Sequence, residues 1–226
     1  MGITLMRMKI RFMRQIGAPF FLVATACLVA LVLPPESRAQ ESVVQLDPAQ
    51  TKIDFSLSGN FHTVHGTFSL KNGTIRFDPA GGKISGDIVV DAKSGESGNT
   101  GRDSKMHREI LESAKFPEIV FAPRQFTGTV AAAGNSNLQV SGQFRLHGHD
   151  HDFTVPVSVM SESGQLTVAC HLTIPYVQWG MKNPSNFLLR VSDKVEIDIR
   201  ATGRVQSAGT AQLETAPGTY RANPAQ

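Results

Sequence analysis

The chain has little cysteine, tryptophan or tyrosine, with two, one and two of these among 226 residues. Cys27 lies in an N-terminal apolar run, so removal of that run leaves Cys170 alone and excludes an internal disulfide. Packing must then hold the fold together. The scarcity of Trp and Tyr argues against an outer-membrane barrel, which carries girdles of aromatic residues at both membrane interfaces.

The N-terminal segment has no acidic residue before Glu36, whereas four basic residues lie between positions 7 and 14. An apolar run follows over 18–33, short for a membrane span of roughly 20 residues. Small residues at Ser37 and Ala39 then suit signal peptidase. This order predicts a secretory signal peptide over 1–39, cleaved near Ala39, and an exported, periplasmic protein. An uncleaved N-terminal anchor and a lipoprotein attached through Cys27 are the alternatives.

The rest of the chain has no excess of charge of either sign. Five of the 22 basic residues and one of the 19 acidic residues lie in 1–39, which leaves 17 and 18. This balance excludes the basic footprint of a nucleic-acid-binding protein. The remaining residues suffice for one domain, which we place at 40–205. The segment 206–226 is small, polar and proline-containing, and is predicted to be a flexible tail.

The sequence also lacks the motifs of common enzymes. It contains no serine elbow, zinc-protease helix or phosphate-binding loop. Cys170 stands on an apolar face between Val168 and Leu172, where a thiol is expected to be buried and inert. We therefore expect a protein without catalytic activity.

What the chain has in abundance is alternation of apolar and polar residues, which predicts half-buried antiparallel strands. Turn-forming residues separate them at 58–60, 71–73, 78–82, 131–137 and 161–164. Eight or nine such strands with one apolar face predict a closed barrel or a sandwich. Three glycines on the apolar faces, Gly66, Gly86 and Gly142, are expected to leave room inside. The alternating segments are 51–57, 64–70, 73–78, 83–92, 118–122, 138–146, 153–159, 166–174 and 195–201.

One segment has helical spacing instead. Met106, Ile110 and Leu111 fall on one face of a helix of about ten residues, which follows a glycine-rich loop at 94–101. Asp103 or Ser104 is predicted to cap its start, and it ends before Pro117.

Histidines concentrate at two places. His62 and His65 stand at a turn that enters a strand, and LHGHDHDF holds three more around Gly148 and Asp150, both turn formers. We interpret the second place as a β-hairpin. A metal- or haem-binding module is the alternative, because clustered imidazoles bind zinc or copper. Its ligands would come from the first pair and from His147, His149 and His151.

Four stretches together resemble the YceI-like family of exported bacterial polyisoprenoid-binding proteins, over about 43–205. These are FSLSGNFHTVHGTFSLKNGTIRFD, GRDSKMHREILESAKFPEIVF, VSGQFRLHGHDHDFTVPV and IPYVQWGMKNPSNFLLRVSDKVEIDI. The resemblance implies an all-β fold: a closed eight-stranded antiparallel lipocalin-like barrel with one short helix inserted between strands. It also implies a long isoprenoid lipid in the lumen, either a polyprenyl phosphate or an isoprenoid quinone, for carriage, storage or sensing. No cofactor besides this lipid is expected.

The alternation fits a core filled by side chains as well as a hollow barrel. Only the family resemblance favours a lumen that holds a ligand. A head group at the mouth would meet Arg102, Lys105 and His107, with Trp179 covering one end of the barrel. The sequence decides neither whether the protein contacts a membrane transiently nor whether it forms a homodimer. The residues expected to line the lumen are Phe55, Phe68, Phe77, Ile88, Phe121, Phe144, Phe153, Val157, Leu172 and Ile197.

Overall fold

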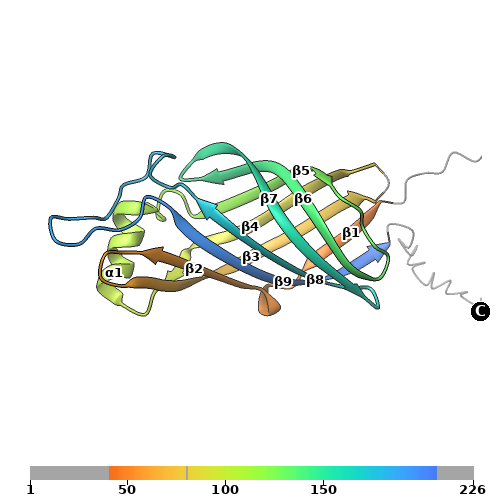
Figure 1. Cartoon of the computed structure of the whole chain (residues 1–226), viewed down its shortest axis with the longest axis horizontal. Helices are drawn as coiled ribbons and strands as arrows, with labels where there is room; N and C mark the ends of the chain where they lie inside the picture. The colour runs from red at the N-terminus through yellow and green to blue at the C-terminus, as the bar shows by residue number, and fades with distance from the viewer. Residues whose placement is uncertain (1–40, 80, 208–226) are drawn as a thin grey trace, which may run out of the picture. The chain divides into compact units, whose positions relative to one another are not determined.

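The computed structural model describes residues 41–79 and 81–207 (Figure 1). The predicted signal peptide, 1–39, lies outside the described residues, as does the predicted tail beyond 207. Within the described ranges, no helix is long and apolar enough to span a membrane.

Nine strands form one antiparallel sheet that closes on itself. β1 and β2 share a single place in it, because both pair with β3 on one side and with β9 on the other. The barrel therefore has eight strand positions, as predicted. The strands are β1 (Ser42–Leu46), β2 (Lys52–Ser58), β3 (Thr63–Asp78), β4 (Lys83–Glu96), β5 (Glu118–Thr127), β6 (Gly134–Leu146), β7 (His149–Glu162), β8 (Gln165–Ile174) and β9 (Val195–Ser207).

A short 3₁₀ turn, η1 (Pro48–Gln50), divides the shared place into β1 and β2. Asp47 caps it, since its carboxylate accepts a hydrogen bond from the Ala49 amide at 2.9 Å. Pro48 cannot donate to a neighbouring strand, so the ladder is interrupted there. The sequence analysis missed β1, although Val44 and Leu46 stand on either side of the polar Gln45 and are buried.

The turn predicted at 71–73 is wrong, because β3 passes through Lys71–Gly73 without reversing. The pairing of β3 with β4 shifts register between Leu70 and Asn72. This irregularity takes up the extra residue and bends the strand, so the turn-forming residues mark a bulge and not a hairpin. Turn residues at 79, 81–82 and 163–164 are found where turns were predicted.

The predicted helix is present between β4 and β5, but its start differs. α1 (Thr100–Lys105) is capped by Asn99, whose side-chain oxygen accepts from the Arg102 amide at 2.9 Å. The predicted caps, Asp103 and Ser104, lie inside the helix instead. The helix continues as a π-helical turn, η2 (Met106–Ile110), in which the Leu111 amide donates to the Met106 carbonyl at 2.8 Å.

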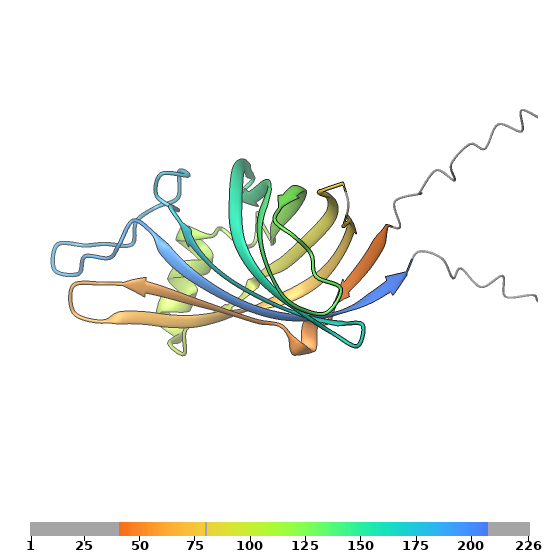
Figure 2. The same ribbon diagram turned by 45° about the vertical axis from the view of Figure 1, so that its right-hand side comes forward.

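The helix and the segment that joins β8 to β9 lie at one end of the barrel, where β2 also turns into β3 (Figure 1, Figure 2). The opposite end has the start of β1, the end of β9 and the turns that join β3 to β4, β5 to β6 and β7 to β8. We call the first the helix end and the second the terminal end.

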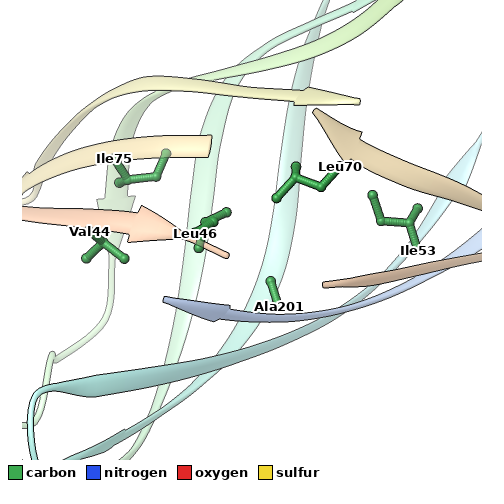
Figure 3. Packing of buried hydrophobic residues seen from close by; sticks show 6 residues of the cluster. All are labelled: Val44, Leu46, Ile53, Leu70, Ile75 and Ala201. Atoms are coloured by element: carbon green, nitrogen blue, oxygen red, sulfur yellow. The ribbon is translucent and has the colours of Figure 1, made fainter. Parts of the chain in front are cut away.

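Two clusters of buried apolar residues pack inside the barrel. Figure 3 shows the six buried members of the first, which come from β1, β2, β3 and β9. The second lies at the helix end and includes Leu146, Ile174, Tyr176 and Met181. Among the described residues no large side chain is completely buried, and many inward-facing ones, such as Phe68 and Ile88, are only half-buried. A core filled by side chains would bury them.

The glycines on the apolar faces do not leave room, contrary to expectation. A side-chain carbon on Gly66 would collide with the ring of Phe55 and the carbonyl of Glu96, and one on Gly142 with the carbonyl of Ala122. Their role is to let neighbouring groups approach the backbone.

Candidate functional site

A cavity of about 900 Å³ occupies the interior of the barrel. Its lining reaches Ala131 and Ser161 at the terminal end and Arg102 and Lys105 at the helix end. Nearly all other lining side chains are aliphatic or aromatic. A cavity of this size, with carbon walls and a few polar groups, is typical of small-molecule sites, and an eight-stranded barrel is just wide enough for one ligand.

A belt of apolar residues crosses the middle of this cavity. Register places Leu138 opposite Val157, and Val157 opposite Cys170. Cys170 faces Ile199, which in turn faces Ile53. All five line the cavity, so the strand pairing itself fixes the inward direction of this belt.

The structure brings nine of the ten predicted lumen residues to the cavity wall. The exception is Phe153, whose ring lies 5.7 Å from that of Phe144 and 5.7 Å from that of Trp179, measured between centroids. It packs against these two rings and is not part of the cavity lining. The nine are Phe55, Phe68, Phe77, Ile88, Phe121, Phe144, Val157, Leu172 and Ile197.

Arg102 and Lys105 are the only charged side chains on the wall within the described ranges. The Arg102 guanidinium is held in place by Ser97: its Nε donates to the Ser97 hydroxyl at 2.7 Å and an Nη donates to the Ser97 carbonyl at 2.8 Å. The Lys105 ammonium donates to the Pro184 carbonyl at 3.3 Å. The wall is therefore mainly apolar, with two cations at the helix end.

Asp103 stands between these cations in sequence but does not line the cavity. Its carboxylate accepts hydrogen bonds from the amide, at 3.0 Å, and the hydroxyl of Ser97. The hydrogen bond from the Ser97 hydroxyl lowers the pKa of Asp103 below its usual value, with the Arg102 charge as a smaller cause. Asp103 is thus ionised, and it fixes Ser97 under the Arg102 side chain.

His107, the third residue predicted at the mouth, points elsewhere. Its Nε2 donates to the Gly95 carbonyl at 2.8 Å, and its Nδ1 lies 3.0 Å from the Ser113 hydroxyl. The imidazole therefore ties η2 to the end of β4 and does not line the cavity.

The family model for the YceI-like domain matches residues 44–203, which include α1, the whole of β2 to β8 and parts of β1 and β9. The chain belongs to the YceI-like family.

Solved structures have the same fold as this YceI-like domain. One is Burkholderia cenocepacia BcnA, with 20% identity and a TM-score of 0.57 over 70% of this chain and 98% of that one. Another is a polyisoprenoid binding domain from Saccharophagus degradans implicated in plant cell wall breakdown, with 18% identity and a TM-score of 0.58 over 72% and 98%. The Campylobacter jejuni YceI protein matches at 14% identity and a TM-score of 0.50 over 66% and 85%. No curated protein sequence matched the chain.

The three histidines of the YceI-like domain's β6–β7 hairpin have separate neighbours. His147 and Gly148 form a two-residue turn, with φ of 53° and 79°, as the hairpin prediction required. The Nε2 of His147 lies 2.7 Å from a Glu112 carboxylate oxygen, whereas His149 is exposed. His151 stacks on Trp179, with the ring centroids 4.0 Å apart and the planes inclined by 5°.

The alternative metal site therefore has no assembled set of ligands. In the described part of the chain, no group of three or more His, Cys, Asp or Glu side chains could hold a metal ion. Of the other pair, His62 is exposed in the turn after β2, and the Nδ1 of His65 lies 2.9 Å from the Ser56 hydroxyl on the outer face.

Trp179 packs against the apolar cluster at the helix end of the YceI-like domain and is not part of the cavity lining. It covers Phe144, at 5.6 Å between ring centroids, and Phe153. The loop that carries it is anchored by Tyr176, whose hydroxyl donates to the Ser192 carbonyl at 2.7 Å, and burial raises the pKa of Tyr176 to about 12.

The sequence analysis missed the wall residues that follow β8, among them Asn186, Leu189 and Val191. The stretch SNFLLRV has neither strand nor helix periodicity, so no wall residue was predicted there. The clearest sign of a functional role in this stretch was the apolar pair Phe187 and Leu188 after Pro184, in a loop that is otherwise polar.

Proposed function

We propose that this YceI-like domain carries a long-chain isoprenoid lipid, with the prenyl chain in the cavity and the head group at Arg102 and Lys105. One observation supports this above all: among the described residues the wall is mainly apolar along its length and has two cations, and no anion, at one end. A polyprenyl phosphate is complementary to this wall, because it has an apolar chain with an anionic group at one end. An isoprenoid quinone would offer carbonyl acceptors to the same two donors.

The chain of such a lipid supplies the driving force. Each buried CH₂ contributes roughly 0.8 kcal/mol, and ordering of the chain offsets part of the sum. The half-buried wall residues, including Phe68 and Ile88, become fully covered when a chain fills the cavity. The Saccharophagus degradans domain that has this fold is described as polyisoprenoid-binding, which supports the same ligand class here.

We also propose export to the periplasm and binding without catalysis. Export rests on the basic, apolar and small-residue order of 1–39. Binding without catalysis rests on the wall: in the described ranges its titratable groups besides the two cations are Tyr176 and Cys170, and burial keeps both protonated.

The test is native mass spectrometry of the protein purified from cells that contain isoprenoid lipids. We expect a complex heavier than the protein by the mass of one lipid. Val157→Phe places a ring in the middle of the cavity and should remove this complex or select a shorter chain. Ser158→Phe, on the adjacent outward-facing residue, is the matched control and should keep it. A spectrum that shows only protein without lipid in every preparation would refute the proposal.

A further inference from the structure

Large apolar side chains are exposed at the helix end of the barrel. Phe61 is 75% exposed, Phe187 97% and Leu188 73%. We call these three residues the apolar rim. Among the described residues the other large apolar side chain of comparable exposure is Met160, at 49%, which lies near the terminal end. Exposed apolar groups collected at one place mark an interaction surface.

The apolar rim is built on two loops that are tied together. The side-chain amide of Asn60 donates to the Leu188 carbonyl at 3.2 Å and accepts from the Arg190 amide at 3.2 Å. The Asn60 amide donates to the Arg190 carbonyl at 3.0 Å. Both views show the two loops at the same end of the barrel (Figure 1, Figure 2). The three side chains are therefore presented together, although 126 positions separate Phe61 from Phe187.

The same loop faces the cavity with its other side chains. Asn186, Leu189 and Val191 line the wall, whereas Phe187 and Leu188 between them point into solvent. The apolar rim thus adjoins the mouth of the cavity, on the side of Lys105, whose ammonium contacts the Pro184 carbonyl. A chain that entered the cavity from an apolar phase at the rim would not cross water.

Charge around the mouth differs from charge elsewhere. Residues 59–62, 100–110 and 175–194 contain six basic and three acidic residues, whereas the rest of 40–226 contains eleven and fifteen. A positive surface with exposed apolar side chains complements a bilayer that contains anionic lipid.

We propose that the apolar rim and the cations around it dock the mouth on the surface of an anionic phospholipid bilayer. The rim side chains enter the interface between head groups and acyl chains, and Lys182 and Arg190 contact the phosphates. This inference rests on the proposed function, because docking gives the cavity direct access to a lipid ligand. It assigns the route of loading: lipid passes between the bilayer and the cavity at the helix end.

The experiment measures binding to vesicles of phosphatidylcholine alone and of phosphatidylcholine mixed with phosphatidylglycerol, by co-sedimentation. All variants are made in the full chain and purified in the form that the host cell yields, so residues 1–40 are treated alike in every sample. The rim variant is Phe61→Ser/Phe187→Ser/Leu188→Ser, with Met160→Ser as its control. The charge variant is Lys182→Gln/Arg190→Gln, with Lys83→Gln/Arg204→Gln, at the terminal end, as its control.

We expect the parent to bind the mixed vesicles more tightly, and less so at high salt. The charge variant should bind them roughly thirtyfold more weakly, since each basic side chain near an anionic surface contributes about a factor of five. The rim variant should bind both kinds of vesicle at least about a hundredfold more weakly. Both controls should bind like the parent.

Equal binding by the rim variant and Met160→Ser would overturn the inference. So would a dimer of the parent, seen by analytical ultracentrifugation, that the rim variant loses while neither protein binds vesicles, because the rim would then be an interface between copies. Native mass spectra of the same samples separate this inference from the proposed function. Lipid-loaded protein that ignores vesicles refutes docking alone, and rim-dependent docking without any bound lipid refutes the lipid ligand alone.

Discussion

Cys170 shows how a wall position decides the chemistry of one residue. Burial raises the pKa of its thiol to about 11, and the nearby Asp198 adds to the shift. Because an ordinary thiol has its pKa near 9.0, the reactive thiolate should be about a hundredfold scarcer near pH 8. We expect iodoacetamide to modify Cys170 at least about a hundredfold more slowly than the cysteine of Ser158→Cys on the outer face. Peptide mass spectrometry follows each site, and similar rates at the two positions would contradict the burial argument.

Two histidines should make the free energy of unfolding depend on pH in opposite directions. The hydrogen bond that His171 Nδ1 donates to the Asp198 carboxylate, at 2.8 Å, raises the pKa of His171 above 6.5, with the Glu196 charge as a smaller cause. The stabilisation that His171 contributes to the fold is complete below pH 6.5 and is lost as pH rises through the raised pKa. Burial beneath Trp179 lowers the pKa of His151, so its stabilisation is present above 6.5 and is lost as pH falls through the lowered pKa.

Urea unfolding midpoints over this pH range test both. His171→Gln should remove the loss on the alkaline side, and His151→Phe, which keeps a stacked ring, should remove the loss on the acidic side. The same pH profile for both variants as for the parent would show that neither group is linked to folding.

At the scale of elements, the close approach of strands depends on glycine. Gly66→Ala forces a carbon against Phe55 and the Glu96 carbonyl, and should lower the free energy of unfolding by about 1–3 kcal/mol. Gly101→Ala, in α1, meets no atom closer than 3.5 Å and should raise it by about 0.5–1 kcal/mol. Urea unfolding distinguishes them. A neutral Gly66→Ala would mean that the Phe55 ring moves aside without cost.

Alternation was a sufficient guide to most strands because each has one face on the interior and one on water. It failed where a local signal has two structural meanings. Lys71, Asn72 and Gly73 have the composition of a turn, but strand β3 accommodates them as a bulge, since β1 and β4 already flank it on both sides. Asn99 was overlooked as the cap because Asp103 and Ser104 are equally good capping residues, and only the length of β4 decides between them.

At the scale of the whole molecule, whether the barrel is hollow could not be predicted from the residues alone. Phe68, Ile88 and Val157 would alternate in the same way around a filled core. The half-buried state of these residues and the cavity of about 900 Å³ depend on the closure of eight strand positions around one interior. The grouping of Phe61 with Phe187 likewise follows from that closure, which brings the β2–β3 turn beside the segment before β9.

The charge distribution along the cavity makes a final prediction about selectivity. A polyprenyl phosphate and the polyprenyl alcohol of the same length share one chain and differ only in the head group that meets Arg102 and Lys105. Arg102→Gln/Lys105→Gln should weaken binding of the phosphate by about ten- to a hundredfold, because hydrogen bonds to a charged group contribute about 1.5–3 kcal/mol. Binding of the alcohol should change by less than about threefold. Lys83→Gln/Arg204→Gln, which removes the same charge from the terminal end, should leave the binding of both lipids unchanged.

Thermal unfolding of delipidated protein with each lipid added back measures the affinities, since a ligand that binds the folded state raises the unfolding midpoint. Equal losses for phosphate and alcohol would place the head group away from α1, whereas a loss confined to the phosphate makes these two cations the feature by which the barrel selects an anionic lipid.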